Sequence, residues 1–150
     1  VRLTNDPPLE VRVSAPQSLA IMKLISWDER AEGGSKDAED FFLIIRAYLE
    51  LGNLNRLSHD AADLVDVPDF DYEQAGARLL GRDMAASCNV ETAGHLSEIL
   101  VRETGEKDRY RLVEAMGGHD LFGDGAEFER VLGLLESVRI GFVEGMAKKS

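Results

Sequence analysis

The chain is expected to be mainly helical, because apolar residues recur three and four positions apart along most of its length. Ser, Asn, Pro and Gly residues divide this pattern into segments of helical length. We therefore expect a helical, bundle-like domain over residues 15–150. Its predicted helices lie at about 15–30, 36–51, 54–65, 72–87, 90–103, 107–116 and 126–147.

The ends of the predicted helices carry residues that cap or stop a helix. Ser14, Ser35 and Asn89 each stand before a helical segment, where a side-chain oxygen can accept from a free backbone N–H. Gly33 and Gly34 form a short turn between the first two segments. We therefore expect the first two helices to form an antiparallel hairpin.

One short segment near the N-terminus follows a different pattern. Leu9, Val11 and Val13 alternate with polar residues, which puts them on one face of a β-strand. A lone strand cannot satisfy its backbone hydrogen bonds, so it must join a sheet or pair with another copy. Because the sequence also opens at Val1 without a methionine, we expect a fragment in which residues 1–14 end a sheet that lies upstream.

A strip of small residues runs along the last predicted helix. Gly133, Ser137, Gly141 and Gly145 follow one another at intervals of four, so they share one helical face. Small side chains let the backbone of a second helix approach closely. The strip favours close packing against another helix of the same chain over dimerisation.

The charge balance limits the classes of function. The 150 residues include 17 Lys and Arg against 28 Asp and Glu, a formal net charge of −11 at pH 7. This field repels phosphate backbones, which disfavours a protein that coats nucleic acid. The longest uncharged stretch, residues 13–22, is half as long as the ~20 residues of a membrane helix. Cys88 is the single cysteine, so no internal disulfide can form, and we expect a cytoplasmic protein without a membrane span.

Two groups of charged residues flank the predicted hairpin turn. Lys23 stands among apolar residues in the first helix and shares a helical face with Arg30. Asp37 and Asp40 share a face in the first turn of the second helix, and Lys36 stands four residues before Asp40. The hairpin is expected to bring both groups to one place, an arrangement suited to a triphosphate and its metal ion.

Each charged group also has a simpler interpretation. The ammonium group of Lys23 can reach solvent at the edge of the core. Acidic residues in a first helical turn complement the positive end of the helix dipole. Spacing alone therefore does not distinguish a ligand site from ordinary surface charge.

Two stretches nevertheless resemble a known family. Residues 19–30 follow the pattern Leu-x-x-x-Lys-Leu-x-x-Trp-x-x-Arg, and residues 36–40 read Lys-Asp-Ala-Glu-Asp. Together they resemble the late motif of AbiEii-type nucleotidyltransferases of the DNA polymerase β superfamily. Residues 69–83, Asp-Phe-Asp-Tyr-Glu-Gln-Ala-Gly-Ala-Arg-Leu-Leu-Gly-Arg-Asp, are similar to the helical region that follows this motif in a bacterial subgroup of predicted nucleotidyltransferases. The similarity covers most of residues 9–147.

The resemblance assigns roles to the charged residues around the hairpin. It implies that Lys36, Asp37 and Asp40 support catalysis and that Lys23 and Arg30 bind the nucleotide. In such families a Gly-Ser motif and an Asp-x-Asp pair on an upstream sheet hold the triphosphate and two metal ions.

The upstream motifs do not occur in this chain. Its single Gly-Ser lies at 34–35, and the Asp-x-Asp at 69–71 comes after the late motif instead of before it. The resemblance therefore implies the C-terminal helical part of a nucleotidyltransferase. An NTP would be the substrate of the full-length protein, and Mg²⁺ would be held only with the missing catalytic half. We expect this chain alone to hold no metal and to be inactive.

A second interpretation belongs to a different class of function. Residues 31–75 contain eleven acidic residues against three basic ones, a local charge of −8. Asp60, Asp63, Asp66 and Asp69 recur every three residues, but the pattern of an EF-hand calcium loop does not follow, which favours a solvated acidic face. The alternative to the enzyme is thus a non-catalytic helical module that docks a basic protein, such as a regulatory DNA-binding protein.

Overall fold

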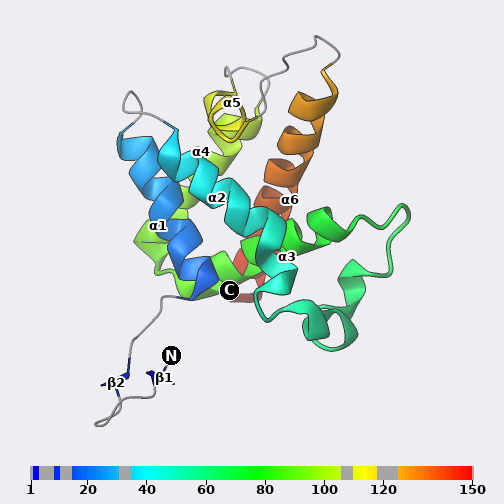
Figure 1. Ribbon diagram of the computed structural model, residues 1–150. Helices are drawn as coiled ribbons and strands as arrows, with labels where there is room; N and C mark the ends of the chain where they lie inside the picture. Colours follow the sequence, from blue (N-terminus) through cyan, green and yellow to red (C-terminus); the bar gives the residue numbers. More distant parts are fainter. Residues whose placement is uncertain are drawn as a thin grey trace.

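The computed structural model describes residues 2–3, 9–10, 15–30, 35–105, 110–117 and 125–149, and it is mainly helical (Figure 1). Of residues 15–30, 35–105, 110–117 and 125–149, 81% lie in helices. The α-helices are α1 (Pro16–Glu29), α2 (Lys36–Ala47), α3 (Tyr72–Ser87), α4 (Val90–Thr104), α5 (Arg111–Ala115) and α6 (Ala126–Lys149). Three 3-10 helices lie between α2 and α3: η1 (Tyr48–Glu50), η2 (Leu54–Ser58) and η3 (Ala62–Leu64). The predicted helical class is confirmed.

Two short strands precede the helices. β1 (Arg2–Leu3) pairs antiparallel with β2 (Leu9–Glu10), so that Arg2 lies opposite Glu10. Residues 11–13 of the predicted strand lie outside the described residues. A strand over 9–13 that joins an upstream sheet therefore stays a prediction.

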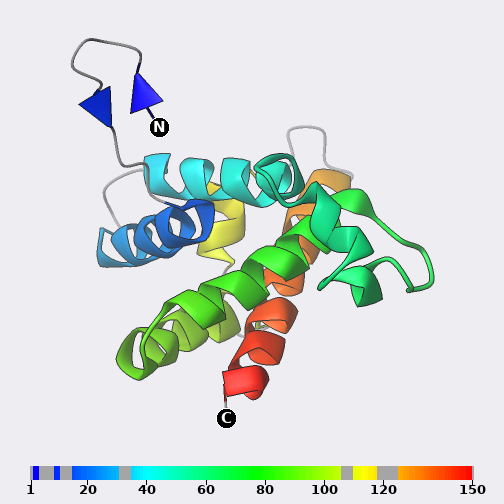
Figure 2. The same cartoon turned by 90° about the horizontal axis from the view of Figure 1, so that it is seen from below.

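Helices α3 and α6 pack against each other through glycines. A Cβ atom at Gly141 of α6 would overlap the carbonyl oxygen of Arg78 in α3, and one at Gly145 would lie 2.7 Å from the carbonyl oxygen of Arg82. Figure 2 shows the two helices crossing at this contact. The strip of small residues on the last helix thus packs within the chain, as the sequence predicted.

The hairpin of α1 and α2 lies on one side of this crossing. The two helices run side by side in both views (Figures 1 and 2) and are joined by ion pairs. Ala20, Leu24 and Trp27 of α1 and Phe41 and Ile45 of α2 are buried in the common core. Burial of this apolar face fixes which side of the hairpin its charged residues occupy.

The prediction of an α-helix over 54–65 is wrong. Two separate 3-10 helices occupy this range, and the chain turns between them at His59 (φ −132°, ψ −108°). The segment is rich in Asn, Ser and Asp, whose side chains compete with backbone groups for hydrogen bonds. Arg56 also reaches out of the segment to Asp83 on α3, which anchors the turn by a tertiary contact instead of by helical hydrogen bonds.

The predicted helix caps have different outcomes. Asn89 caps α4, since its side-chain oxygen accepts from the backbone N–H of Thr92 at 2.8 Å. Ser35 precedes α2 but caps no backbone N–H; its hydroxyl donates instead to Glu39 Oε1 at 2.7 Å. Ser14 lies outside the described residues, and Ala15 takes the capping position of α1.

Candidate functional site

The structure brings all five predicted site residues together where α1 and α2 face each other. Lys23 Nζ lies 2.9 Å from Asp40 Oδ2 and 3.5 Å from Asp37 Oδ1. Lys36 Nζ lies 2.8 Å from Asp40 Oδ1, and Arg30 Nη1 lies 3.8 Å from Asp37 Oδ2. We call these five residues the hairpin cluster. Its two carboxylates lie among three cations, which leaves a net charge of +1.

The helical positions of the residues explain this convergence. Leu24 and Trp27 turn one face of α1 into the core, which leaves Lys23 on the flank that faces α2. Asp37 and Asp40 lie one turn apart on the facing flank of α2, and each forms an ion pair with Lys23. The lysine that could have reached solvent alone is thus held between two carboxylates.

The ion pairs keep the central groups of the hairpin cluster charged. Hydrogen bonds from Lys36 and Lys23 lower the pKa of the Asp40 carboxyl. The hydrogen bond to Asp40 in turn raises the pKa values of Lys23 and Lys36. Because these pKa values move away from neutrality, Asp40 and the two lysines are suited to electrostatic roles and not to general acid–base catalysis.

Two cations of the hairpin cluster remain open to solvent. The side chain of Lys36 is 79% exposed and that of Arg30 is 75% exposed, whereas Lys23 is mostly covered. Each exposed group forms an ion pair on one side and has further N–H donors that meet no acceptor among the residues that the structure describes. The arrangement can therefore bind an anionic group at its outer edge while Lys23 holds the two helices together.

The described residues do not supply a metal site. Over the described ranges, no group of three or more His, Cys, Asp and Glu side chains is placed to hold a metal ion. Asp37 and Asp40 already face ammonium and guanidinium groups, which compete with a cation for the same oxygens. The residues present thus do not fit Mg²⁺, and no catalytic step can be assigned to such an ion here.

A second network of charges lies between α3, α6 and the 3-10 segment, and sequence reasoning missed it. Arg82 on α3 donates to Asp63 (2.6 Å) and to Glu144 on α6 (3.0 Å). Arg78, one turn earlier, forms a bidentate pair with Glu144. The spacing of four between the arginines was the available signal, but no pattern in the sequence identifies partners more than sixty positions away.

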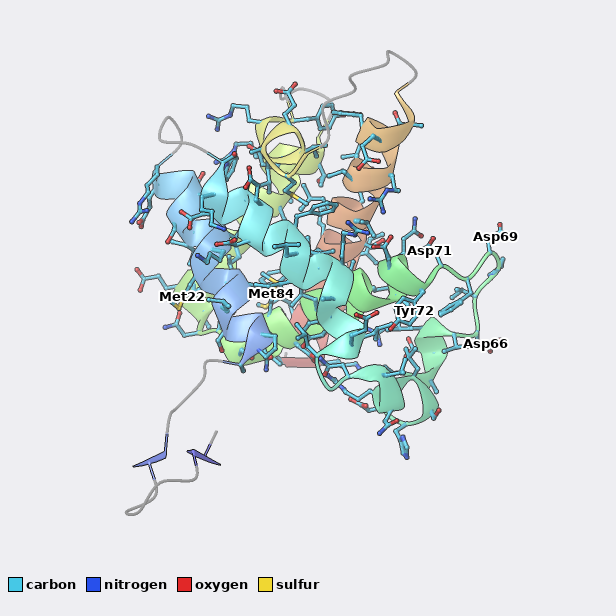
Figure 3. All side chains as sticks on the ribbon, in the orientation of Figure 1. Met22, Asp66, Asp69, Asp71, Tyr72 and Met84 are labelled. Carbon is cyan, nitrogen blue, oxygen red and sulfur yellow. The ribbon has the colours of Figure 1, made fainter. Side chains whose placement is uncertain are left out.

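The predicted acidic face divides into paired and unpaired residues. Five of the ten acidic side chains of residues 35–75 have cationic partners within the chain: Asp37, Asp40, Asp60, Asp63 and Glu73. Asp66 and Asp69, in contrast, form no ion pair or hydrogen bond with any residue that the structure describes. Figure 3 shows both on the segment between η3 and α3, on the opposite side of the molecule from Met22 of α1. These two unpaired carboxylates thus lie away from the hairpin cluster.

The lone cysteine has the environment of a packing residue. Cys88 is buried and lies at the end of α3, and its thiol donates weakly to the carbonyl oxygen of Ala85 at 3.7 Å. Burial raises the pKa of this thiol, which disfavours the thiolate form needed for nucleophilic attack. This environment suits a small packing residue at a helix end and not a nucleophile.

Comparisons with known proteins identify no relative. No protein family model, no curated protein and no solved structure matches the chain. Across the described helices, none is long and apolar enough to cross a membrane. The fold therefore defines a broad class, a mainly helical protein, and the resemblance to nucleotidyltransferases depends on the residues quoted for it.

Proposed function

We propose that this chain is the helical C-terminal part of a nucleotidyltransferase-like protein and that the hairpin cluster forms one wall of its NTP–Mg²⁺ cleft. The observation that carries the proposal is the placement of Lys23 Nζ within 3.5 Å of both Asp37 and Asp40. Lys23 lies at least 14 positions before the two aspartates in the sequence, and the resemblance selected all three residues. In the structure they meet at one place. This convergence supports a site more strongly than either charged segment alone.

Each residue of the hairpin cluster has a distinct role in this proposal. The exposed ends of Lys36 and Arg30 contact phosphate oxygens and offset the charge that develops when the acceptor hydroxyl displaces pyrophosphate. Asp40 fixes the ammonium groups of Lys36 and Lys23, and Asp37 fixes Arg30. In the full-length protein, residues outside this chain would hold Mg²⁺, which would supply charge neutralisation between the phosphates.

The first test compares substitutions in a longer protein that carries the catalytic half. Lys36→Ala and Asp40→Ala should each lower the rate of nucleotidyl transfer at least about tenfold, because each removes a charge that is positioned for transfer. Single-turnover rates with radiolabelled NTP measure the effect, and melting curves of the same variants measure stability.

Glu39→Ala is the matched control for this test. Glu39 lies beside Asp40 on the same turn but points about 100° away, and its carboxylate accepts from Ser35 instead of joining the hairpin cluster. Its removal should leave the transfer rate within about threefold of wild type. If all three substitutions leave the rate within that range, the assignment of a nucleotide to this wall is wrong.

The second test uses the 150-residue chain alone. We expect titration calorimetry with ATP and Mg²⁺ to show no binding in the micromolar range, because the carboxylates that would hold the metal ions are not among the described residues. We also expect no release of pyrophosphate. Micromolar binding or measurable pyrophosphate would contradict the proposal that the catalytic residues lie elsewhere.

The competing function is a non-catalytic module that docks a basic protein. The unpaired carboxylates of Asp66 and Asp69 favour it, since they lie away from the hairpin cluster. The coding sequence upstream of Val1 separates the two functions. A Gly-Ser motif followed by Asp-x-Asp on a predicted sheet supports the enzyme, whereas a gene that begins near Val1 supports the module.

A further inference from the structure

A groove lined by both apolar and polar side chains lies between the start of α3, the segment before it and the middle of α6. Its cavity measures about 190 Å³. The residues that line it include Val67, Phe70, Gln74, Ser137 and Ile140. A cavity of roughly 150 Å³ can hold a benzene-sized group, so this one has room for a single apolar side chain.

Several apolar side chains of the groove are open to solvent. Val67 is 37% exposed, Phe70 is 42% exposed and Ile140 is 43% exposed. They come from the segment before α3 and from α6, so they form one surface from two distant parts of the chain. Contiguous exposed apolar side chains with a polar rim are typical of interaction sites.

The rim of the groove is negative. Asp69 and Asp71 line the cavity, and Asp66 lies on the same segment (Figure 3). The one cation that lines the cavity, Arg78, is neutralised by its bidentate pair with Glu144. A positively charged ligand would therefore meet carboxylates at the rim, and no unpaired cation among the lining residues would repel it.

We propose that this groove binds a basic peptide segment of a partner protein. One apolar side chain of the segment enters the cavity beside Phe70 and Ile140, and flanking Arg or Lys side chains pair with Asp66 and Asp69. Charge complementarity selects this occupant, because an acidic or neutral segment would leave the rim carboxylates unpaired. The proposal rests on the docking of a basic protein described above as the competing function and names its site. It does not depend on nucleotidyl transfer, since the groove shares no residue with the hairpin cluster.

The test uses a fluorescein-labelled peptide of the sequence acetyl-Gly-Lys-Arg-Leu-Arg-Lys-Gly-amide and fluorescence anisotropy at low salt. We expect saturable binding below 1 mM. The double variant Asp66→Asn/Asp69→Asn should weaken binding about three- to tenfold, because two rim pairs are lost. Asparagine is chosen because it tolerates the left-handed backbone of Asp69 (φ 56°). Ile140→Ser should weaken binding by a similar factor through loss of apolar contact.

Two controls separate this site from general attraction to an acidic protein. Glu91→Gln/Glu98→Gln removes the same charge from exposed positions of α4 and should change the affinity less than twofold. A peptide with Gly in place of its Leu should bind at least threefold more weakly. Equal loss in the two double variants, equal binding of both peptides, or no saturable binding up to 1 mM would each overturn the proposal. None of these measurements involves a nucleotide. A negative result would therefore overturn the peptide site without contradicting the proposed transferase function.

Discussion

Gly141→Ala is expected to destabilise the fold severely, since an added Cβ would occupy the position of the Arg78 carbonyl oxygen. It would also lie 2.7 Å from the carbonyl carbon of that residue, which is backbone and cannot rotate aside. Relief requires α3 and α6 to separate, which uncovers the core between them. We expect a loss of at least about 4 kcal/mol in the free energy of unfolding, a large share of a typical domain's stability. Denaturant melts followed by circular dichroism measure it.

Gly133→Ala on the same helix is the matched control. A Cβ there would lie 3.6 Å from Gln74 Nε2, which is ordinary van der Waals contact. Removing a helical glycine should then stabilise the protein by up to about 1 kcal/mol. If the free energy of unfolding of Gly141→Ala lies within about 1 kcal/mol of the wild-type value, α3 and α6 do not cross as closely as described.

Local sequence patterns predicted most of the helical elements. The helix predicted over 72–87 is α3 (Tyr72–Ser87). The one predicted over 15–30 is one residue longer than α1 at each end, and the one predicted over 90–103 ends one residue before α4 does. Periodic apolar residues with a capping residue or proline at the start determine these helices without reference to the rest of the chain. The last helix begins at the predicted residue and runs two residues further, to Lys149.

Elements that depend on distant contacts were not predictable in this way. The second helix ends at Ala47 and continues as η1, which buries Tyr48 while its hydroxyl donates to Asp83 on α3. Burial and this hydrogen bond both raise the pKa of Tyr48, so the phenol stays neutral. The Arg56–Asp83 pair likewise shapes the 3-10 segment from 27 positions away. Sequence spacing carries no information about such partners.

The candidate site shows the same division. The hairpin turn and helical spacing correctly predicted that Lys23, Arg30 and the charged start of α2 would converge, because only one short connection separates them. The groove of the further inference combines Phe70 with Ile140, seventy positions apart. Its lining residues have no shared local pattern, so it emerges only from the packing of α3 against α6.

The ion-pair network around Glu144 is expected to make stability fall in acid. Arg78 and Arg82 both donate to this carboxylate and lower its pKa from 4.5 to about 2. The unfolded chain therefore takes up this proton at a higher pH than the folded protein does. The stabilisation is complete above about pH 4.5 and is lost as the pH falls toward 2. Protonation of Glu144 removes one of the two carboxylate partners of Arg82, whose side chain is only 10% exposed.

Glu144→Gln tests this dependence by keeping the shape of the side chain and removing its charge. We expect the variant to unfold about 2 kcal/mol more easily than wild type at pH 7, because two arginines lose an ionic partner and solvent screens only part of the interaction. At pH 3 the difference between variant and wild type should shrink by about 1–2 kcal/mol, since the wild-type contribution has by then partly gone. Urea melts at pH 7, 5 and 3 measure both differences, with Glu98→Gln as an exposed control on α4 that should track wild type throughout. The difference in the free energy of unfolding between Glu144→Gln and wild type could instead stay constant from pH 7 to 3. The carboxylate would then titrate alike in the folded and unfolded states, which would contradict the role of Arg78 and Arg82 in holding it ionised.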